Sequence, residues 1–279
     1  MTDNEFEHDH HPSAPYTSID EMTEGTIVHL ATGVEIAFDL LVNVIGSNSA
    51  IYLGENHDNL AAHEVQLKLI KALYERRNGK IAIGMEMFRC DVQDRLDGLT
   101  TGALPHDAFN QLFDEQWSWR PAYQPILDFI HENRLPLIGL KPTKAVEDVV
   151  REGGRDENTP ELELWDVHHR PHYLPQFQNS AHPERAERGY RIMTLWDEAM
   201  AHHTARFLSD SANRDTLMIT LAGSGHINYG FGIPKRTFRR FQHSYVTLLP
   251  LTQHDPEHSA LLQIADYVWK VPYKTQFDV

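Results

Sequence analysis

Short runs of apolar residues recur along this chain, and each run ends abruptly in polar residues or glycine. Such runs are typical of buried strands, because a strand that is covered on both faces presents no polar side to water. The runs that fit this description are 51–53, 81–85, 137–140, 217–221 and 245–249. The pattern therefore predicts five or more strands, with one strand at each of these runs.

The segment between the first two runs has the spacing of a helix. Leu60, Leu67 and Ile70 recur at helical intervals up to about residue 77, and Asn59 can cap the first turn. A strand, a helix and a second strand at this spacing indicate parallel pairing through a right-handed crossover. The predicted fold class is α/β, with a mainly parallel sheet and helices on both of its faces.

Two long stretches without a strand pattern, near 89–134 and 142–215, are predicted to be helical insertions. Both permit helices but are broken by prolines, and we expect them to form a lobe over one edge of the sheet. Residues 1–24 are acidic and histidine-rich without apolar periodicity, so a mobile tail is expected; its histidines could bind a metal, although nothing arranges them as ligands. No internal repeat or long linker divides the rest, so 25–279 should form one domain.

Composition and charge narrow the range of partners. The 279 residues include 25 Lys and Arg against 40 Asp and Glu, and the formal charge of -15 opposes binding to nucleic acid or to an anionic membrane. The single cysteine, Cys90, excludes an intramolecular disulfide and a cysteine-rich zinc site. No run approaches the roughly 18 apolar residues of a membrane span, and the first residues do not resemble a signal peptide. We therefore expect a cytoplasmic protein.

Reactive side chains follow three of the predicted strands. Glu55 and His57 come directly after the first strand. Glu86 ends the second strand, and His226 follows the fourth. In open parallel sheets ligands bind outside the carboxyl ends of the strands, and glycines at these ends let the backbone turn sharply. We therefore expect these four side chains to surround one cleft.

Several chemical roles are open to this set. Imidazoles and carboxylates are ligands that zinc, manganese or iron accept, so His57, Glu86 and His226 could form a divalent metal site. Without a metal, the same groups and Glu55 could catalyse acid–base hydrolysis, with a histidine as base and a glutamate that orients it. A structural role, with each histidine bonded only to a loop, is the third alternative. The sequence has no HExxH, Walker or GxSxG motif.

Aromatic residues are concentrated in segment 117–123, which contains two indoles, a guanidinium and a phenol. Such a group suits a flat apolar ligand with acidic substituents, and haem is a ligand of this kind. In that case Trp119 offers apolar area, Arg120 meets a propionate, and Tyr123 is the candidate donor to iron. The alternative is that these aromatic side chains only pack the core of the helical lobe.

The motifs also occur in a recognisable order. They are GENHDN at 54–59, GMEMF at 84–88, YQPIL at 123–127, GSGH at 223–226 and GIP at 232–234. In this order, and over about residues 25–250, the chain resembles the ChaN family of haem-binding proteins. The family belongs to a superfamily with the Tiki metalloproteases and the erythromycin esterases. The resemblance implies a parallel sheet core with a helical lobe.

The resemblance also carries expectations about function. The superfamily cleft consists of glycine-framed histidines and glutamates, which match Glu55, His57, Glu86 and His226. A haem-binding protein in haem or iron handling is therefore expected, and the alternative is a metal-dependent or His/Glu hydrolase of ester or peptide bonds. Haem or another small molecule is the expected partner, and a homodimer is an open alternative to a monomer. Lys141 stands where the family usually has asparagine, which changes the polarity of the cleft.

Overall fold

The computed structural model describes residues 18–178, 182–255 and 264–275. Within them the chain forms an 8-stranded sheet with strand order β2-β1-β8-β7-β3-β6-β4-β5. Neighbouring strands from β8 to β5 are parallel, and the antiparallel pairs are β1 with β2 and β1 with β8, so the predicted mainly parallel sheet is confirmed. The strands are β1 (Ile27–His29), β2 (Val34–Glu35), β3 (Ala50–Glu55), β4 (Ile81–Arg89), β5 (Leu137–Lys141), β6 (Leu217–Gly223), β7 (Tyr245–Leu251) and β8 (Tyr267–Lys270).

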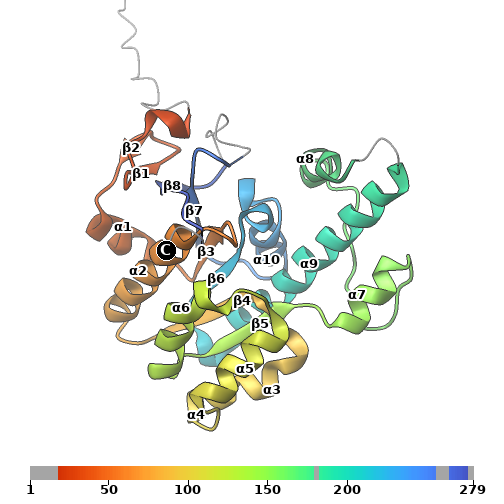
Figure 1. The fold of residues 1–279 in the computed structure, drawn as a ribbon, viewed down its shortest axis with the longest axis horizontal. Helices are drawn as coiled ribbons and strands as arrows, with labels where there is room; N and C mark the ends of the chain where they lie inside the picture. Colours follow the sequence, from red (N-terminus) through yellow and green to blue (C-terminus); the bar gives the residue numbers. More distant parts are fainter. Residues whose placement is uncertain (1–17, 179–181, 256–263, 276–279) are drawn as a thin grey trace, which may run out of the picture.

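Helices cover both faces of this sheet, as predicted (Figure 1). The helices are α1 (Phe38–Ile45), α2 (Leu60–Arg76), α3 (Gln93–Leu96), α4 (Gly98–Thr101), α5 (His106–Gln116), α6 (Arg120–Glu132), α7 (Lys144–Arg151), α8 (His169–Tyr173), α9 (Pro183–Ser209) and α10 (Ile233–Arg240). Alternate residues of β3 enter two different cores, because successive strand side chains point to opposite faces. Ile51 and Leu53 pack on the side of α1, α2, α5 and α6, whereas Ala50 and Tyr52 pack on the side of α9 and α10.

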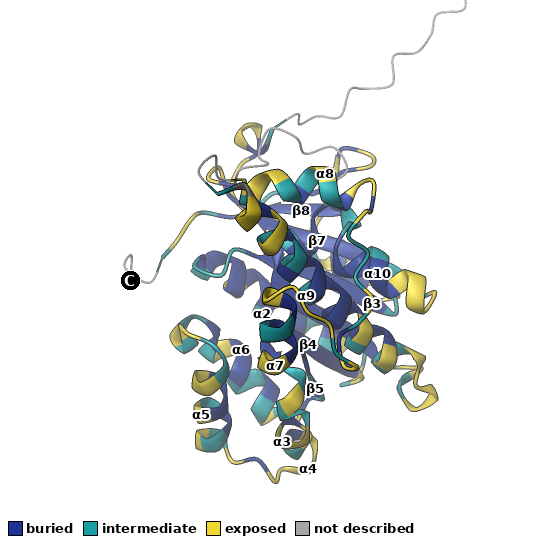
Figure 2. Ribbon diagram, turned by 90° about the vertical axis from the view of Figure 1, so that its right-hand side faces the viewer, coloured by how far each residue is buried: buried dark blue, intermediate teal, exposed yellow. Residues whose placement is uncertain are grey.

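Helix α2 illustrates how the sequence specifies these elements. The predicted helix from Leu60 to about residue 77 is observed as Leu60–Arg76, and the Asn59 side chain accepts a hydrogen bond from the backbone N–H of Ala61 at 3.1 Å. Leu69, Ile70 and Leu73 are fully buried against the sheet. Truncating one of these side chains to alanine should cost about 2–5 kcal/mol of stability. Figure 2 shows the resulting arrangement, with buried strands between helices whose outer faces are exposed.

The first insertion differs from the expected lobe over one edge. Phe109, Phe113 and Ile126, from α5 and α6, belong to the same core as Ile83 of β4, so it covers a face of the sheet. The physical reason is that α5 and α6 carry apolar stripes at helical spacing, which are buried most completely against the sheet. In the second insertion, α9 packs on the edge strand β5 and on α10, and α7 and α9 share a small core of their own, so this part lies at one edge.

The packed part of the chain also begins earlier than expected. Ile19 and Met22 are buried in the core beside β8, so residues 18–24 are not part of a mobile tail. The rest of that predicted tail, including its histidines, lies outside the described residues. Among the helices of the described segments, none combines the length and the hydropathy that crossing a bilayer requires.

Candidate functional site

Three neighbouring strands bring the expected side chains together. Strand β6 lies between β3 and β4 in the sheet, so the carboxyl ends of all three meet at one edge. His57 follows β3, and its Nε2 atom lies 3.9 Å from Oε2 of Glu86 on β4. His226 follows β6, and its Nε2 atom lies 3.8 Å from Oε1 of the same carboxylate. Glu86 therefore stands between the two imidazoles.

Glu86 is held in this place by the backbone of β6. Its side chain is only 1% exposed, and Oε2 accepts a hydrogen bond from the N–H of Gly223 at 2.8 Å. Position 223 requires a small residue, because a Cβ atom there would lie 2.9 Å from Nε2 of His57. The glycine thus lets His57 approach both the strand end and Glu86.

A buried carboxylate orients His57. Its Nδ1 atom lies 2.7 Å from Oε1 of Glu55, the same oxygen accepts a hydrogen bond from the Tyr123 hydroxyl at 2.5 Å, and Gln66 donates to Oε2 at 2.7 Å. Burial alone would raise the pKa of Glu55, but the charge of His63 and the hydrogen bonds from His57 and Tyr123 lower it to about 2. The Nε2 atom of His57 is consequently directed into the cleft.

The same carboxylates set the protonation of His57. Burial favours the neutral imidazole, but the hydrogen bond to Glu55 and the charge of Glu86 outweigh it and raise the pKa of His57 to about 9. At neutral pH the ring therefore carries a proton on both nitrogens. His57 is then a proton donor toward the cleft.

A second buried carboxylate orients His226. Its Nδ1 atom lies 2.7 Å from Oδ1 of Asp197, whose other oxygen lies 2.8 Å from Nε2 of His169. The Nδ1 atom of His169 in turn meets the hydroxyl of Tyr190 at 2.9 Å. Burial would lower the pKa of His226, but the negative charges of Glu86 and Asp197 raise it. His226 therefore belongs to a chain of buried polar groups that extends into α8 and α9.

No role for Asp197 or His169 emerged from the sequence. Asp197 lies inside α9, and a buried acid in a helix of apolar periodicity is a signal that it has a partner. That partner could not be identified, because His226 is 29 residues further along the chain. His169 lies in a short helix, α8, and no motif surrounds it.

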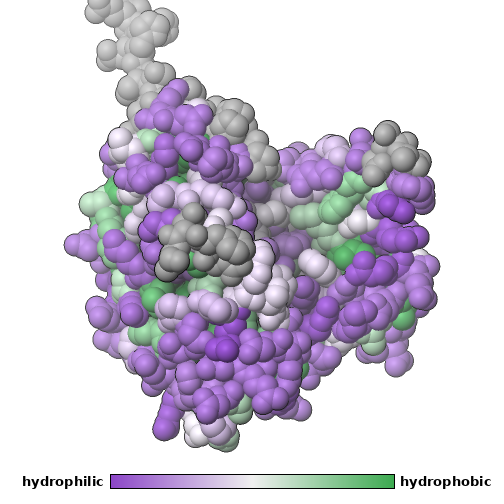
Figure 3. Space-filling view, viewed as in Figure 1, coloured by the Kyte–Doolittle hydropathy of each residue, from purple (hydrophilic) through white to green (hydrophobic). Residues whose placement is uncertain are grey.

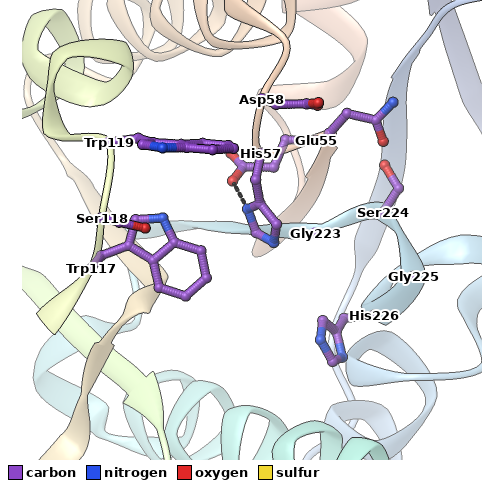
Figure 4. A pocket seen from close by; sticks show the side chains of 11 residues that line it. Glu55, His57, Asp58, Trp117, Ser118, Trp119, Gly223, Ser224, Gly225 and His226 are labelled. Atoms are coloured by element: carbon purple, nitrogen blue, oxygen red, sulfur yellow. Dashed lines mark hydrogen bonds and ion pairs between the residues drawn. The ribbon is translucent and has the colours of Figure 1, made fainter.

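The cleft opens into a cavity of about 560 Å³. Figure 4 shows the indoles of Trp117 and Trp119 on one side, His226 on the other, and His57 between them. Trp119 is 46% exposed, which is a large fraction for an indole. Its backbone adopts the left-handed conformation, with φ of 66°, at the start of α6. The cavity thus combines an aromatic wall with the polar groups at the strand ends.

Lys141 adds a buried cation behind this wall. Its ammonium nitrogen lies 4.6 Å from the ring centroid of Trp117 and 4.0 Å from that of Trp196. Burial lowers the pKa of Lys141, while the charge of Glu86 acts in the opposite direction. The departure from the family pattern at this position therefore places a cation close to the cleft.

The three residues predicted to contact haem have different positions. Trp119 lines the cavity, as expected of an apolar contact. Tyr123 does not line it: the side chain is fully buried, its hydroxyl donates to Glu55, and burial together with the charge of Glu55 raises its pKa well above the usual value. Arg120 is engaged by Asp114 at 2.8 Å and by Gln124 at 2.5 Å. Tyr123 and Arg120 thus differ from the expectation, because existing partners occupy their polar atoms.

The expected divalent metal site is not supported. In the part of the chain that the structure describes, no three His, Cys, Asp or Glu side chains are grouped so that they could hold a metal ion. His57 and His226 each use one nitrogen to bind a buried carboxylate, and their other nitrogens face Glu86. Both of these nitrogens therefore lie 3.8–3.9 Å from the same carboxylate, beyond direct hydrogen-bond distance.

The fold and the site define an α/β protein with a cleft of paired histidines and carboxylates at the strand ends. A model of the family described as "Haem-binding uptake, Tiki superfamily, ChaN" matches residues 41–237. The chain belongs to this family, which confirms the resemblance seen in its motifs. A comparison with curated protein sequences finds no match.

One solved structure has a closely similar fold, and others are more distantly similar. ChaN of Campylobacter jejuni, from a structure described as showing cofacial haem binding, is 17% identical with a TM-score of 0.72 over 87% of this chain and 95% of that chain. An erythromycin esterase mutant in its open conformation is 16% identical, with a TM-score of 0.49 over 83% of this chain and 77% of that chain. A protein from Bacillus cereus is 13% identical, with a TM-score of 0.47 over 80% and 76%. The likeness to the Campylobacter protein supports the α/β fold.

Proposed function

We propose that the cleft is an acid–base site that binds a small organic molecule and hydrolyses an ester or peptide bond in it. The observation that carries this proposal is the pair of oriented imidazoles on either side of Glu86. In each histidine a buried carboxylate fixes Nδ1, so that Nε2 is presented to the cleft. Histidines held in this way transfer protons efficiently during catalysis.

The protonation states suit a direct attack by water. Glu86 accepts a proton from a water molecule near the two Nε2 atoms as the water oxygen bonds to the carbonyl carbon of the substrate. His57, which carries a proton at neutral pH, gives it to the leaving oxygen or nitrogen as the carbon–heteroatom bond breaks. The proton on Glu86 then returns to His57, and His226 stabilises the negative charge that develops on the carbonyl oxygen.

Hydrolysis of p-nitrophenyl esters and of a fluorogenic peptide tests this proposal. His57→Ala should lower kcat/KM by about a hundredfold or more, the usual contribution of a general acid. His202→Ala, which removes an exposed imidazole on α9, is the matched control and should leave the rate unchanged. Wild-type rates at background with both probe classes would overturn the proposal, as would a His57→Ala protein with the full rate.

Haem binding, in a role in haem or iron handling, is the second candidate. Family membership and the two indoles on the cavity wall support it. The residues fit the flat apolar part of haem better than its iron, because Tyr123 is buried and His57 would have to lose a proton to become a ligand. Bound haem would supply redox chemistry that the side chains lack, or would itself be the molecule that the protein carries.

Haem titration followed by absorption spectroscopy tests the second candidate. If haem occupies the cavity, Trp119→Ala should weaken its binding, since the exposed indole then loses its contact area. Trp165→Ala removes another exposed indole that does not line the cavity, and it serves as the control. Binding that both variants leave unchanged would contradict the assignment to this cavity.

The cytoplasmic location and the homodimer stay predictions. Cell fractionation of the natural host measures the first, with soluble and membrane fractions compared for the same protein. Light scattering on the purified protein measures the second. A single molar mass close to 32.1 kDa at all concentrations would contradict a homodimer.

A further inference from the structure

A second cavity, of about 570 Å³, lies along α9 and is called the α9 cavity below. Three arginines, Arg151, Arg185 and Arg188, line one part of it. His226 lines both this cavity and the cavity beside His57. Figure 3 shows that the molecule is hollowed between the part built from α7 to α9 and the rest, with hydrophobic residues on the α9 side. The two cavities therefore meet at a residue of the proposed acid–base site.

The arginine end presents two guanidinium groups that make no ion pair in the described segments. Arg185 and Arg188 are exposed, and within the described segments neither makes an ion pair. Glu187 pairs with Arg170. Glu152 and Glu184, in contrast, share a neighbouring pocket with Arg188 without an ion pair to it.

Arg151, in contrast, is bound to Glu147 and contributes less net charge. Two guanidinium groups without an ion pair at one cavity stand out in a chain whose formal charge is -15. Such groups attract carboxylate, sulfonate or phosphate.

The other end of the α9 cavity is apolar. Ile192, Met193 and Trp196 follow one another along α9 and line it. Phe177 packs directly on the helix at Gly189, where a Cβ atom would lie 2.6 Å from the phenyl ring. These side chains form a hydrophobic wall between the arginines and His226.

We propose that the α9 cavity binds the anionic end of an elongated organic acid. Its apolar middle lies against Trp196 and Ile192, and its far end reaches His226 and Glu86. The substrate class is then an ester or amide with an apolar body and an acidic group distant from the scissile bond. The identity of the substrate as an ester or amide rests on the proposed hydrolysis. The binding of the anionic end does not, because it requires no turnover.

Two fluorescent probes that differ only in charge test the cavity. Both 8-anilinonaphthalene-1-sulfonate and N-phenyl-1-naphthylamine contain the same aromatic rings, but only the first has a sulfonate. The double variant Arg185→Gln/Arg188→Gln should weaken sulfonate binding roughly tenfold and leave the neutral probe unchanged, because only the charged contact is lost. Arg155→Gln/Arg214→Gln removes two exposed arginines outside the described cavities and should change neither affinity.

A variant of the apolar wall completes the test. Trp196→Ala should weaken both probes, since the contact area is lost whatever the charge. Three results would overturn the proposal. The two double arginine variants could weaken sulfonate binding equally, Arg185→Gln/Arg188→Gln could weaken both probes equally, or the wild type could fail to bind the sulfonate. His57→Ala should bind the sulfonate as the wild type does. If the wild type hydrolyses none of the substrates but still prefers the sulfonate probe in an arginine-dependent way, the proposed reaction is wrong and the anion site stands.

Discussion

The two halves of the cleft use the same chemistry in different surroundings. His57 and His226 each bind a buried carboxylate through Nδ1 at 2.7 Å and present Nε2 to Glu86. The His57 side chain is 33% exposed and lines the open cavity, whereas the His226 side chain is only 10% exposed. The first half is therefore more accessible to a ligand, and the second is mainly a buried polar network that reaches the cavities at His226.

This difference assigns separate tasks to the two histidines. Glu55 receives hydrogen bonds from Tyr123 and Gln66. Its second imidazole neighbour, His63, is more distant, with Nδ1 3.5 Å from Oε2. Asp197 instead holds two imidazoles at 2.7 and 2.8 Å, so a proton lost or gained at His226 affects a longer chain of buried groups. Proton donation is best suited to His57, and stabilisation of charge is best suited to His226.

The largest effect is expected from a substitution in the buried half of the cleft, around His226. Asp197→Ala removes the shared partner of His226 and His169 and leaves both imidazoles without it in a buried site. Loss of one member of a buried charged network typically costs about 3–5 kcal/mol. Urea denaturation should therefore show a large loss in the free energy of unfolding. A loss below about 1 kcal/mol, the value typical of an exposed pair, would show that the two halves do not differ as argued.

The two halves of the cleft also differ in how far the sequence predicts them. Glu55 and His57 are two residues apart in one motif, so their pairing at a strand end could be anticipated. The meeting of β3, β4 and β6 follows from the general behaviour of parallel sheets, although their order in the sheet depends on tertiary packing. Asp197 and His226 are joined only by the path of α9 across the opposite face of the sheet.

Tyr123 shows why the type of a side chain does not by itself predict a ligand of iron. Its phenol, beside two indoles in the sequence, suggested a ligand for iron. The structure turns this face of α6 toward the core, where the hydroxyl meets Glu55, a residue 68 positions earlier in the chain. The apolar spacing of Tyr123, Ile126 and Ile130 carried that information, because all three lie on the buried face of the helix.

The pH dependence sharpens the distinction between the halves. The pKa of His57 is raised to about 9, so its stabilising interaction is complete below the ordinary value of 6.5 and is lost as the pH rises through 9. Proton donation by His57 should fail over the same range, and kcat should fall about tenfold for each pH unit above 9. A pH–rate profile measures this. Activity that rises through pH 9 would instead identify neutral His57 as a base.

Low pH should weaken the Glu55–His57 pair through Glu55. The pKa of Glu55 is lowered to about 2, so its contribution to stability is present above the ordinary value of 4.5 and disappears as the pH falls toward 2. Unfolding midpoints of the wild type and Glu55→Gln should therefore differ at pH 6 and converge near pH 2. A difference that stays constant over this range would contradict the ionised state assigned to Glu55.

A smaller change tests the contact between the strand end and His57. Gly223→Ala places a Cβ atom 2.9 Å from Nε2 of His57, and the imidazole can yield by a small rotation. We expect kcat to fall about tenfold, because a catalytic group that is slightly misplaced loses much of its efficiency. The melting temperature should change little. Gly225→Ala is the control, since its Cβ would meet only the end of Met193 at 3.6 Å.

The smallest effect is expected from Tyr123→Phe, which removes one of the hydrogen bonds to Glu55 and keeps the aromatic packing. The Glu55 carboxylate retains His57 and Gln66, so the loss in stability should be about 1.5 kcal/mol, the lower end of the range for a hydrogen bond to a charged group. Without the hydroxyl, Glu55 stays ionised and binds His57 more strongly, so the alkaline limb of the pH–rate profile should move to higher pH. The haem spectrum, if haem binds, should not change, because the phenol lies outside the cavity lining. A lost charge-transfer band would instead make Tyr123 an iron ligand and require α6 to rearrange on binding.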